Sequence, residues 1–133
     1  MKISIITVTF NSEKTIKDTI ESVLKQKYKN YEYLVIDGGS KDKTVDIIRE
    51  YETKFEGRMR WISERDKGMY DGINKGIHMA TGDIVGIINS DDFYHRTDIF
   101  QIINNAFEEH KNIEAIYGDV RFVSPKNLNK TVR

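Results

Sequence analysis

The feature that most constrains the fold of this chain is a repeated alternation of short, strand-like runs with longer amphipathic segments. Runs of strand length lie at residues 3–9, 33–37, 59–63 and 84–88, and a segment of helix length follows each one. Strands that alternate with helices call for right-handed crossovers and a mainly parallel sheet. The sequence therefore predicts an α/β fold with a mainly parallel central sheet, the first strand near its centre, and helices on both faces.

The intervening segments carry apolar side chains at the spacing of an amphipathic helix. The predicted inward faces are Ile16, Ile20, Val23 and Leu24; Thr44, Ile47, Ile48, Tyr51 and Phe55; Met69, Ile73, Ile77 and Ala80; and Ile99, Ile102, Ile103, Ala106 and Phe107. Asn11 or Ser12 is the expected N-cap of the first helix, and Thr97 is that of the last. Later strands are predicted at residues 115–118 and 120–123.

The length of 133 residues predicts one domain, which we place at residues 1–123. Residues 124–133 are polar and basic and have no apolar periodicity. We interpret them as a polar tail at the truncation point of a longer chain.

The charge balance and the cysteine count exclude several classes of protein. Twenty-one basic residues balance twenty-one acidic ones, so a nucleic-acid partner is not expected. The absence of cysteine excludes disulfides, thiolate zinc sites and a cysteine nucleophile, which fits a reducing compartment, and we expect the cytoplasm. No apolar run approaches the roughly 20 residues of a spanning helix, so neither an export signal nor a membrane anchor is predicted.

An acidic pair follows the last apolar run. Residues 84–88 are a continuous apolar run, predicted to be a strand covered on both faces, and Asn89, Ser90, Asp91 and Asp92 come directly after it. Ligands of an open parallel sheet bind beyond the carboxyl ends of its strands. Adjacent carboxylates repel unless a cation lies between them, and hard oxygen ligands suit Mg²⁺ or Mn²⁺. Asp91 and Asp92 are thus predicted to bind a metal for a phosphorylated substrate, although the same residue types also form turns and N-caps.

Polar groups at two other strand ends belong to the same predicted edge. Thr9, Phe10 and Asn11 end the first strand, and Asp37 ends the second. A carboxylate can accept a hydrogen bond from a base N–H or a ribose hydroxyl, and an aromatic ring can flank a base. With a metal that bridges a diphosphate, these groups predict a nucleoside-diphosphate site, while Asp37 and the glycines after it are also typical of a simple turn.

Other nucleotide-binding patterns fail on this sequence. A dinucleotide fold needs G-x-G-x-x-G after the first strand, where this chain has Phe10, Asn11 and Ser12. The segment 38–44 resembles a phosphate loop, but Asp42 stands where the second glycine is required, and its charge would oppose a phosphate. The histidines are scattered singly and indicate no metal site.

Four ordered motifs carry a resemblance to a known family. They are residues 5–11 (IITVTFN), 34–44 (LVIDGGSKDKT), 66–77 (DKGMYDGINKGI), and 80–83 (ATGD) leading to 89–92 (NSDD). In these motifs the sequence resembles the family 2 glycosyltransferases, whose catalytic domain has the GT-A, Rossmann-like, nucleotide-sugar-binding fold. The resemblance covers roughly the first 95 residues, which makes residues 1–123 a donor-binding domain.

The resemblance also implies roles for individual residues. Thr9 and Phe10 would line the base pocket and Asp37 would bind the base. Asp66, Lys67 and Asn74 would lie near the donor. Residues 89–92 would be the family's acidic motif, with Mn²⁺ or Mg²⁺ at Asp91 and Asp92.

Two features depart from the family pattern. Asn89 stands where an aspartate is frequent, so its contact with ribose or metal would be neutral. Family members continue into an acceptor-binding half that supplies the general base. We identify no general base in this chain, because Asp119 lies too close to the predicted sheet.

The expected function is therefore a glycosyltransferase. It would move a sugar from a nucleoside diphosphate, with a UDP-sugar as the expected donor, to a hydroxyl of a glycan or lipid-linked acceptor, with inversion. The resemblance implies bacterial surface-polysaccharide synthesis at the cytoplasmic face of the membrane, with peripheral association. A nucleotide-binding module without turnover remains an alternative. A nucleotidyltransferase is a further one, although the glycine-rich basic loop that it needs after the first strand is missing.

Overall fold

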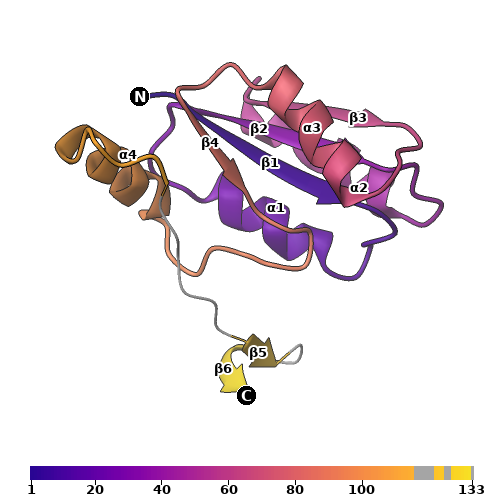
Figure 1. The fold of residues 1–133 in the computed structure, drawn as a ribbon. Coiled ribbons are helices and arrows are strands. Elements are labelled where there is room, and N and C mark those ends of the chain that lie inside the picture. The colour runs from indigo at the N-terminus through magenta and orange to yellow at the C-terminus, as the bar shows by residue number, and fades with distance from the viewer. Residues whose placement is uncertain (116–121, 125–126, 133) are drawn as a thin grey trace.

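The computed structural model describes residues 1–115, 122–124 and 127–132, and beyond residue 115 it describes only the backbone. Its main sheet has four parallel strands in the order β3-β2-β1-β4 (Figure 1). The strands are β1 (Ile3–Thr9), β2 (Tyr31–Asp37), β3 (Met59–Ser63) and β4 (Ile84–Ile87). The predicted α/β fold with a mainly parallel sheet is confirmed, and β1 lies between two neighbours as expected.

Helices connect the strands and follow the last of them. They are α1 (Ile16–Leu24), α2 (Thr44–Glu52) with the short 3₁₀ helix η1 (Thr53–Phe55), α3 (Met69–Met79) and α4 (Ile99–Glu109). The predicted caps are wrong, because α1 begins after Thr15 and α4 after Asp98, neither of which caps its helix through the side chain. No helix in the described part of the chain combines the length and the apolar character needed to cross a bilayer.

The strand register brings the ends of the strands together at one edge of the sheet. Thr9 pairs with Asp37, and Asp37 pairs with Ser63. On the other side of β1, Ile6 pairs with Ile87 near the end of β4. We call this edge, with the loops that follow the four strands, the carboxyl rim, and the opposite edge, with the loops that precede them, the amino rim.

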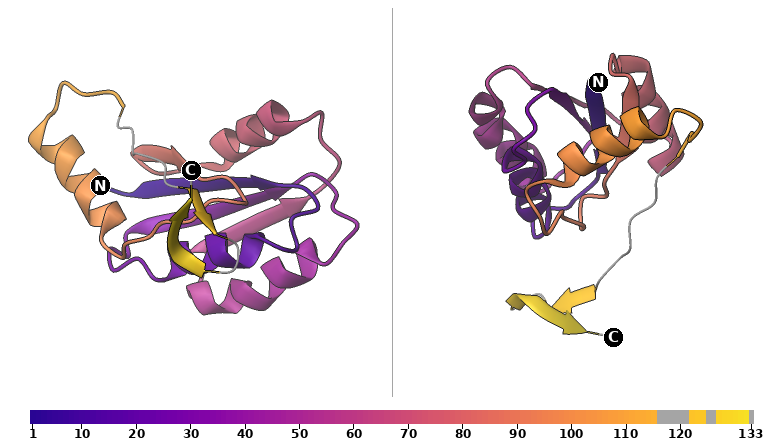
Figure 2. Two further views of the ribbon diagram at one scale, coloured as in Figure 1. Left: turned by 90° about the horizontal axis from the view of Figure 1, so that it is seen from below. Right: turned by 90° about the vertical axis from the view of Figure 1, so that its left-hand side faces the viewer.

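Two layers of helix enclose the sheet (Figure 2). On one face, Ile3 and Ile5 of β1 are buried together with Ile16 and Ile20 of α1 and with side chains of α2 and α4. On the other face, the alternate residues of β1 and β2 lie under α3. Each fully buried isoleucine stabilises the fold by about 1.5–3 kcal/mol, so this two-sided burial holds the rims in place.

Helix α3 approaches the sheet mainly through two glycines, and its predicted apolar stripe faces the sheet only in part. A Cβ at Gly72 would lie 2.6 Å from Val8 Cγ1, and one at Gly76 would lie 2.6 Å from Ile6 Cγ2. Met69 and Ile77, predicted to point inward, are 58% and 48% exposed. The prediction is wrong for these two residues, because the helix backbone approaches the sheet too closely for large side chains and glycine is not part of an apolar pattern. Ala80 packs against the sheet as predicted, and Ile73 is partly buried.

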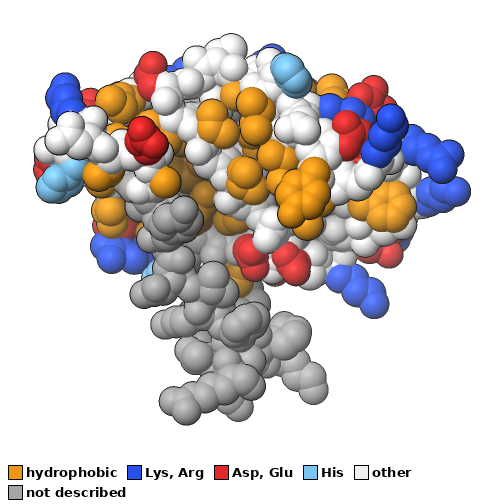
Figure 3. All heavy atoms as spheres, in the orientation of Figure 1, with side chains coloured by type: hydrophobic (Ala, Val, Ile, Leu, Met, Phe, Trp, Pro, Cys, Tyr) orange, Lys and Arg blue, Asp and Glu red, His pale blue; other side chains and the backbone are white. Residues whose placement is uncertain are grey.

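Strand β4 is less buried than its apolar run predicts. It is an edge strand of the sheet formed by the described residues, and Val85 and Ile87 are 46% and 50% exposed. They lie on the face that carries α3, where hydrophobic side chains gather over α3 and β4 (Figure 3). The expected burial on both faces is therefore wrong for this strand, since α3 covers β1 and β2 instead.

The C-terminal segment contains a second, antiparallel pair of strands, β5 (Phe122–Ser124) and β6 (Asn127–Val132). Strand β6 lies in the segment interpreted as a polar tail, and its interpretation as a truncation point stays a prediction. The strand predicted at 115–118 lies outside the described residues except for Ala115, and the one at 120–123 is described only from Phe122. The domain boundary after residue 123 stays a prediction, and it falls within β5.

Candidate functional site

Hydrogen bonds between loops hold the carboxyl rim together. The backbone N–H of Asn11, after β1, donates to Ser40 Oγ, after β2, at 2.8 Å. The N–H of Ser12 donates to Thr44 Oγ1 at 2.8 Å. The hydroxyls of Ser12 and Ser90 lie 3.0 Å apart, which ties the loop after β4 to the same cluster. The loops expected to form the site are thus joined to one another.

The acidic pair lies in a turn that is held by hydrogen bonds within the turn and from α1. The N–H of Asp92 donates to the carbonyl of Asn89 at 3.1 Å, and the Asn89 amide donates to Asp92 Oδ2 at 3.3 Å. Thr19 of α1 donates from its hydroxyl to the carbonyl of Asp92 at 2.5 Å. Asp91 and Asp92 are both exposed, and the Asp91 carboxylate enters no hydrogen bond or ion pair among the described residues. The turn therefore presents carboxylate oxygens to solvent.

The donor set at this turn fits a divalent cation that shares its ligands with a substrate. Within residues 1–115, no group of three or more His, Cys, Asp or Glu side chains is placed to enclose a metal. Asp91 and Asp92 are hard oxygen ligands on adjacent residues. Mg²⁺ and similar ions commonly use one or two carboxylates together with substrate phosphates and water. Two exposed carboxylates fit such a site.

Asp37 lies at the carboxyl rim, and its carboxylate is buried and accepts four hydrogen bonds. The side chain is 0% exposed. Its oxygens accept hydrogen bonds from the N–H groups of Gly39 at 3.1 Å and Ser40 at 2.8 Å, and from the hydroxyls of Ser40 at 2.5 Å and Ser63 at 2.7 Å. These bonds fold the loop after β2 and tie it to β3. Oδ1 accepts only the bond from the Ser40 hydroxyl, and the base-binding role of Asp37 stays a prediction.

Thr9 and Phe10 differ in their surroundings. Thr9 is 2% exposed, and its hydroxyl is buried without a hydrogen-bond partner among the described residues. Phe10 is 59% exposed at the end of β1. An aromatic ring that stays in solvent at a strand end is available to stack on a planar ligand. Both residues lie at the predicted edge, and their contacts with a base stay predictions.

The loop between β3 and α3 places Asp66 against the end of β2. A Cβ at Gly38 would lie 2.8 Å from Asp66 Oδ2, and one at Gly72 would lie 3.4 Å from the same oxygen. Asp66 is half-buried, whereas Lys67 and Asn74 are exposed. Sequence reasoning missed the part played by Gly38 and Gly72. The only available signal was that a glycine occurs in each motif.

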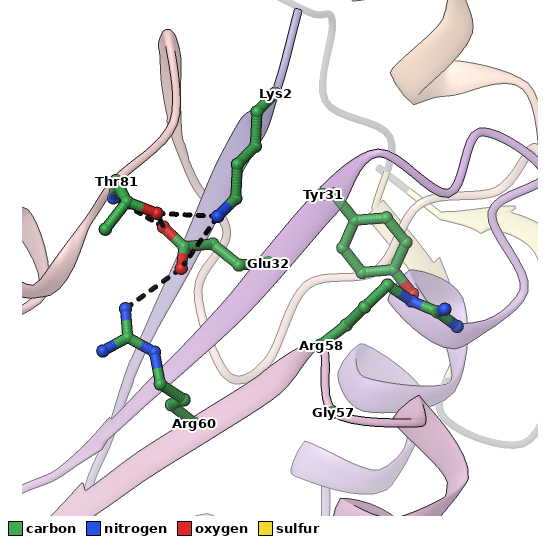
Figure 4. Close-up of a pocket in the computed structure, with 7 residues that line it drawn as sticks. All are labelled: Lys2, Tyr31, Glu32, Gly57, Arg58, Arg60 and Thr81. Atoms are coloured by element: carbon green, nitrogen blue, oxygen red, sulfur yellow. Dashed lines mark hydrogen bonds and ion pairs between the residues drawn. The ribbon is translucent and has the colours of Figure 1, made fainter.

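The amino rim holds a different kind of acidic group. Glu32 is 6% exposed, and its carboxylate accepts hydrogen bonds from Ser4 Oγ at 2.6 Å, Arg60 Nη2 at 3.0 Å, and Thr81 N and Oγ1 at 2.6 and 3.0 Å. Lys2 Nζ lies 3.7 Å away (Figure 4). Burial alone would raise the pKa of Glu32, but the hydrogen bonds from Ser4, Thr81 and Arg60 outweigh it and lower the pKa to about 2.

A cavity of about 340 Å³ lies beside Glu32 at the amino rim. Its lining residues are Lys2, Tyr31, Glu32, Gly57, Arg58, Arg60 and Thr81 (Figure 4). Lys2 and Arg60 both pair with the single carboxylate of Glu32, and Arg58 lies in the same lining, so the lining carries more positive than negative charge. The cavity lies on the edge of the sheet opposite to Asp91 and Asp92.

Comparison with known proteins decides the family. The family model described as Glycosyl transferase family 2 matches residues 4–131. The chain belongs to glycosyl transferase family 2. The resemblance found in the sequence is thereby confirmed.

Curated relatives of this family 2 chain are also named as glycosyltransferases. An uncharacterized glycosyltransferase of Mycobacterium tuberculosis is 38% identical over 117 residues, which cover 87% of this chain and 44% of the relative. A PGL/p-HBAD biosynthesis glycosyltransferase of Mycobacterium bovis is 30% identical over 117 residues, which cover 88% of this chain and 46% of the relative. The chain thus spans about half the length of the relatives that it matches.

A solved structure supports the same fold. Residues 1–349 of Staphylococcus aureus TarS, in complex with UDP-GlcNAc, match with a TM-score of 0.75 and 29% identity. The match covers 84% of this chain and 32% of the TarS chain. The expected GT-A architecture of the family 2 domain is therefore confirmed.

Proposed function

We propose that this family 2 domain binds a nucleoside-diphosphate sugar, with UDP as its nucleotide, and serves a glycosyltransferase that moves the sugar to an acceptor hydroxyl. The observation that carries the proposal is the carboxyl rim, where hydrogen-bonded loops present the exposed pair Asp91 and Asp92 on a GT-A sheet. The UDP-GlcNAc complex of TarS, at 29% identity, supports the choice of nucleotide.

The nucleoside end of the donor lies against the loops after β1, β2 and β3. Phe10 stacks on the base through its exposed ring, and Thr9 and Asp37 form the floor beneath it. Asp66 lies at the same edge, beside Gly38. Lys67 supplies a positive charge at the entry to α3.

The diphosphate end of the donor lies against the acidic turn and the start of α3. Asp91 and Asp92 would hold Mn²⁺ or Mg²⁺ there, with the remaining ligands supplied by phosphate and water. When bound, the ion supplies positive charge to the departing diphosphate. Asn89 contributes a neutral amide to the same turn, and Asn74 of α3 is exposed toward solvent and free to contact the donor.

Our proposal for the acceptor is based on the family resemblance. It favours a glycan or lipid-linked acceptor in surface-polysaccharide synthesis, transfer with inversion, and action at the cytoplasmic face of the membrane. An inverting transfer needs one general base to take the acceptor proton. We assign no such base among the described residues.

Isothermal titration of UDP, with and without Mn²⁺, tests the donor site. The wild type should bind more tightly with the metal, and Asp91→Ala and Asp92→Ala should each weaken metal-dependent binding by about tenfold or more, because a charged ligand is lost. Glu109→Ala, which removes an exposed carboxylate at the end of α4, is the matched control and should bind as the wild type does. UDP affinity that depends neither on the metal nor on Asp91 and Asp92 would refute the metal site. An absence of UDP binding under all conditions would refute the donor site.

A nucleotide-binding module without turnover is the second candidate. The observation that favours it is that we assign no general base among the described residues. Release of UDP from UDP-GlcNAc, followed over hours with and without sugar acceptors, separates the two. Tight binding without release would favour the module, whereas metal-dependent release abolished by Asp91→Ala would favour the transferase.

A further inference from the structure

We infer that Thr19 of α1 is a positioning residue for the acidic turn at residues 89–92. Its buried hydroxyl holds the backbone of this turn, and this fixes the direction in which Asp91 and Asp92 present their carboxylates to one cation. The inference rests on the proposed function and deepens it at the diphosphate end of the donor, because it identifies what orders the turn before the ion binds.

The segment between β4 and α4 lies along one side of α1 (Figure 1). Near its start, the hydroxyl of Thr19 donates to the carbonyl of Asp92 at 2.5 Å. At its end, the side-chain amide of Gln26 donates to the carbonyl of Arg96 at 2.6 Å and accepts a hydrogen bond from the N–H of Phe100 at 3.1 Å. The segment that carries the acidic pair is thus anchored to α1 and to the residues that follow this helix.

Both anchoring side chains are polar groups in the interior of the protein. Thr19 and Gln26 are each 0% exposed. Their spacing of seven residues corresponds to about two helical turns, and they lie beside the buried apolar residues Ile16, Ile20 and Val23. Burial of a polar group costs free energy unless the group is hydrogen-bonded. Packing alone would be served by apolar side chains, so these two residues indicate that α1 binds the segment through specific hydrogen bonds.

The two carboxylates depend on the backbone of the turn for their direction. The Asp91 side chain enters no hydrogen bond or ion pair among the described residues, and that of Asp92 accepts one bond, from the Asn89 amide at 3.3 Å. Both side chains are exposed, so packing does not orient them. The backbone of the turn does, and its carbonyls at Asp92 and Asn89 lie 2.5 and 3.4 Å from the Thr19 hydroxyl.

An ordered turn favours cation binding for two physical reasons. Adjacent carboxylates repel each other, so a turn without this anchor would separate them. Ordering a mobile backbone also costs about 1–2 kcal/mol per residue, and a turn that is already ordered avoids part of this cost when the ion binds. The Thr19 hydroxyl provides this order within the protein itself.

Titration of UDP with and without Mn²⁺ tests the inference. We call the ratio of the two dissociation constants the metal effect. Thr19→Val replaces the hydroxyl by a methyl group and should reduce the metal effect by about fivefold or more. UDP affinity without metal should stay within about twofold of the wild type, because Thr19 is buried and cannot touch the nucleotide. Thr19→Ser keeps the hydroxyl and should retain the metal effect, and Thr19→Ala provides the same test if Thr19→Val folds poorly.

Ser22→Ala is the matched control. Ser22 is 7% exposed in the same helix, and its hydroxyl donates to the carbonyl of Thr19 at 2.7 Å and not to the acidic turn. The change removes a buried hydroxyl and should lower the thermal unfolding temperature, but it should leave the metal effect unchanged. The pair therefore separates a positioning role from a general loss of stability.

Amide hydrogen exchange in the metal-free protein is a second readout. The N–H of Asp92 donates to the carbonyl of Asn89, and its exchange should be faster in Thr19→Val but not in Ser22→Ala. The inference is overturned if Thr19→Val keeps the wild-type metal effect, if Thr19→Ser loses it, or if Ser22→Ala loses it equally. Unchanged exchange at Asp92 in Thr19→Val also overturns the inference alone. A wild type that does not bind UDP overturns the proposed function itself, so the two failures are distinguishable.

Discussion

The two rims of the sheet use carboxylates in opposite ways. At the amino rim, Glu32 is buried and receives four hydrogen bonds as well as an ion pair with Lys2. At the carboxyl rim, Asp91 and Asp92 are exposed, and Asp66 keeps one oxygen without a partner among the described residues. The difference teaches that a saturated carboxylate holds strands together, whereas an oriented but incompletely bonded one is available to a ligand.

One glycine at each rim shows the same difference between structural and accessible groups. A Cβ at Gly82, near the amino rim, would lie 2.6 Å from Ser4 Oγ and 2.8 Å from the backbone oxygen of Lys2. A Cβ at Gly38, at the carboxyl rim, would meet only the carboxyl group of Asp66 among its three nearest atoms. Backbone atoms of a strand cannot move away from an added methyl group, but the end of a side chain can. A methyl group should therefore disturb the fold at one rim and the binding site at the other.

The largest effect is expected from Glu32→Ala at the amino rim. The change leaves Lys2, Arg60 and the Thr81 amide without their common acceptor, and it should lower the free energy of unfolding by about 3 kcal/mol. Urea denaturation measures this loss. UDP affinity of the folded protein should stay within about twofold of the wild type. A variant that keeps full stability would show that the Glu32 network is not structural.

Low pH should remove a part of the stabilisation that the ionised carboxylate of Glu32 provides. The pKa of Glu32 is about 2 in the folded chain, below its ordinary value of 4.5. A lowered folded pKa stabilises the protein above the unfolded pKa, and that stabilisation is lost as the pH falls from about 4.5 toward about 2. The free energy of unfolding should decline over this window, and it should decline less steeply in Glu32→Gln, which cannot ionise. Parallel slopes in the two proteins would contradict the assignment.

Gly82→Ala is expected to have the next largest effect. Its Cβ would press on the backbone of Ser4 in β1 and of Lys2, the residue before β1, and the free energy of unfolding should fall by about 2 kcal/mol. Gly38→Ala is the matched change at the carboxyl rim and should cost less stability, because Asp66 can rotate away. Thermal unfolding compares the pair. If Gly38→Ala is the more destabilising change, the proposed difference between the two rims is wrong.

The smallest effect is expected from Ser63→Ala. The change removes one of the hydrogen bonds to Asp37 and should lower the free energy of unfolding by about 1 kcal/mol. If Asp37 only builds its loop, UDP affinity should change by less than about threefold. A larger loss of affinity, measured by titration, would indicate that Asp37 itself takes part in binding.

Much of the fold was predictable from local pattern. The strands predicted at residues 3–9 and 59–63 match β1 and β3, and the one predicted at 33–37 missed only the first two residues of β2. The inward face of α1 was also predicted, since Ile16, Ile20 and Val23 are buried. These features follow from residue type and spacing, which a single sequence displays directly.

Other features depended on contacts that no local pattern records. Helix α3 turned its glycines inward because its backbone meets Val8 and Ile6 of β1, which are distant in sequence. Strand β4 became an edge strand among the described residues, although its run resembles that of a central strand. In the candidate site, the sequence identified the acidic residues. It did not show which of their carboxylates would accept hydrogen bonds from other parts of the protein.

The sequence by itself determined the class of fold, the family, and the edge of the sheet at which the acidic residues meet, because strand order along the chain and parallel direction place all strand ends together. Only the tertiary structure decided that Asp37 is buried and accepts four hydrogen bonds, and that Asp66 lies against Gly38 with one oxygen that accepts no hydrogen bond from the described residues. The reason is physical: whether a carboxylate is saturated depends on which donors the folded chain brings within hydrogen-bonding distance, and those donors come from other loops.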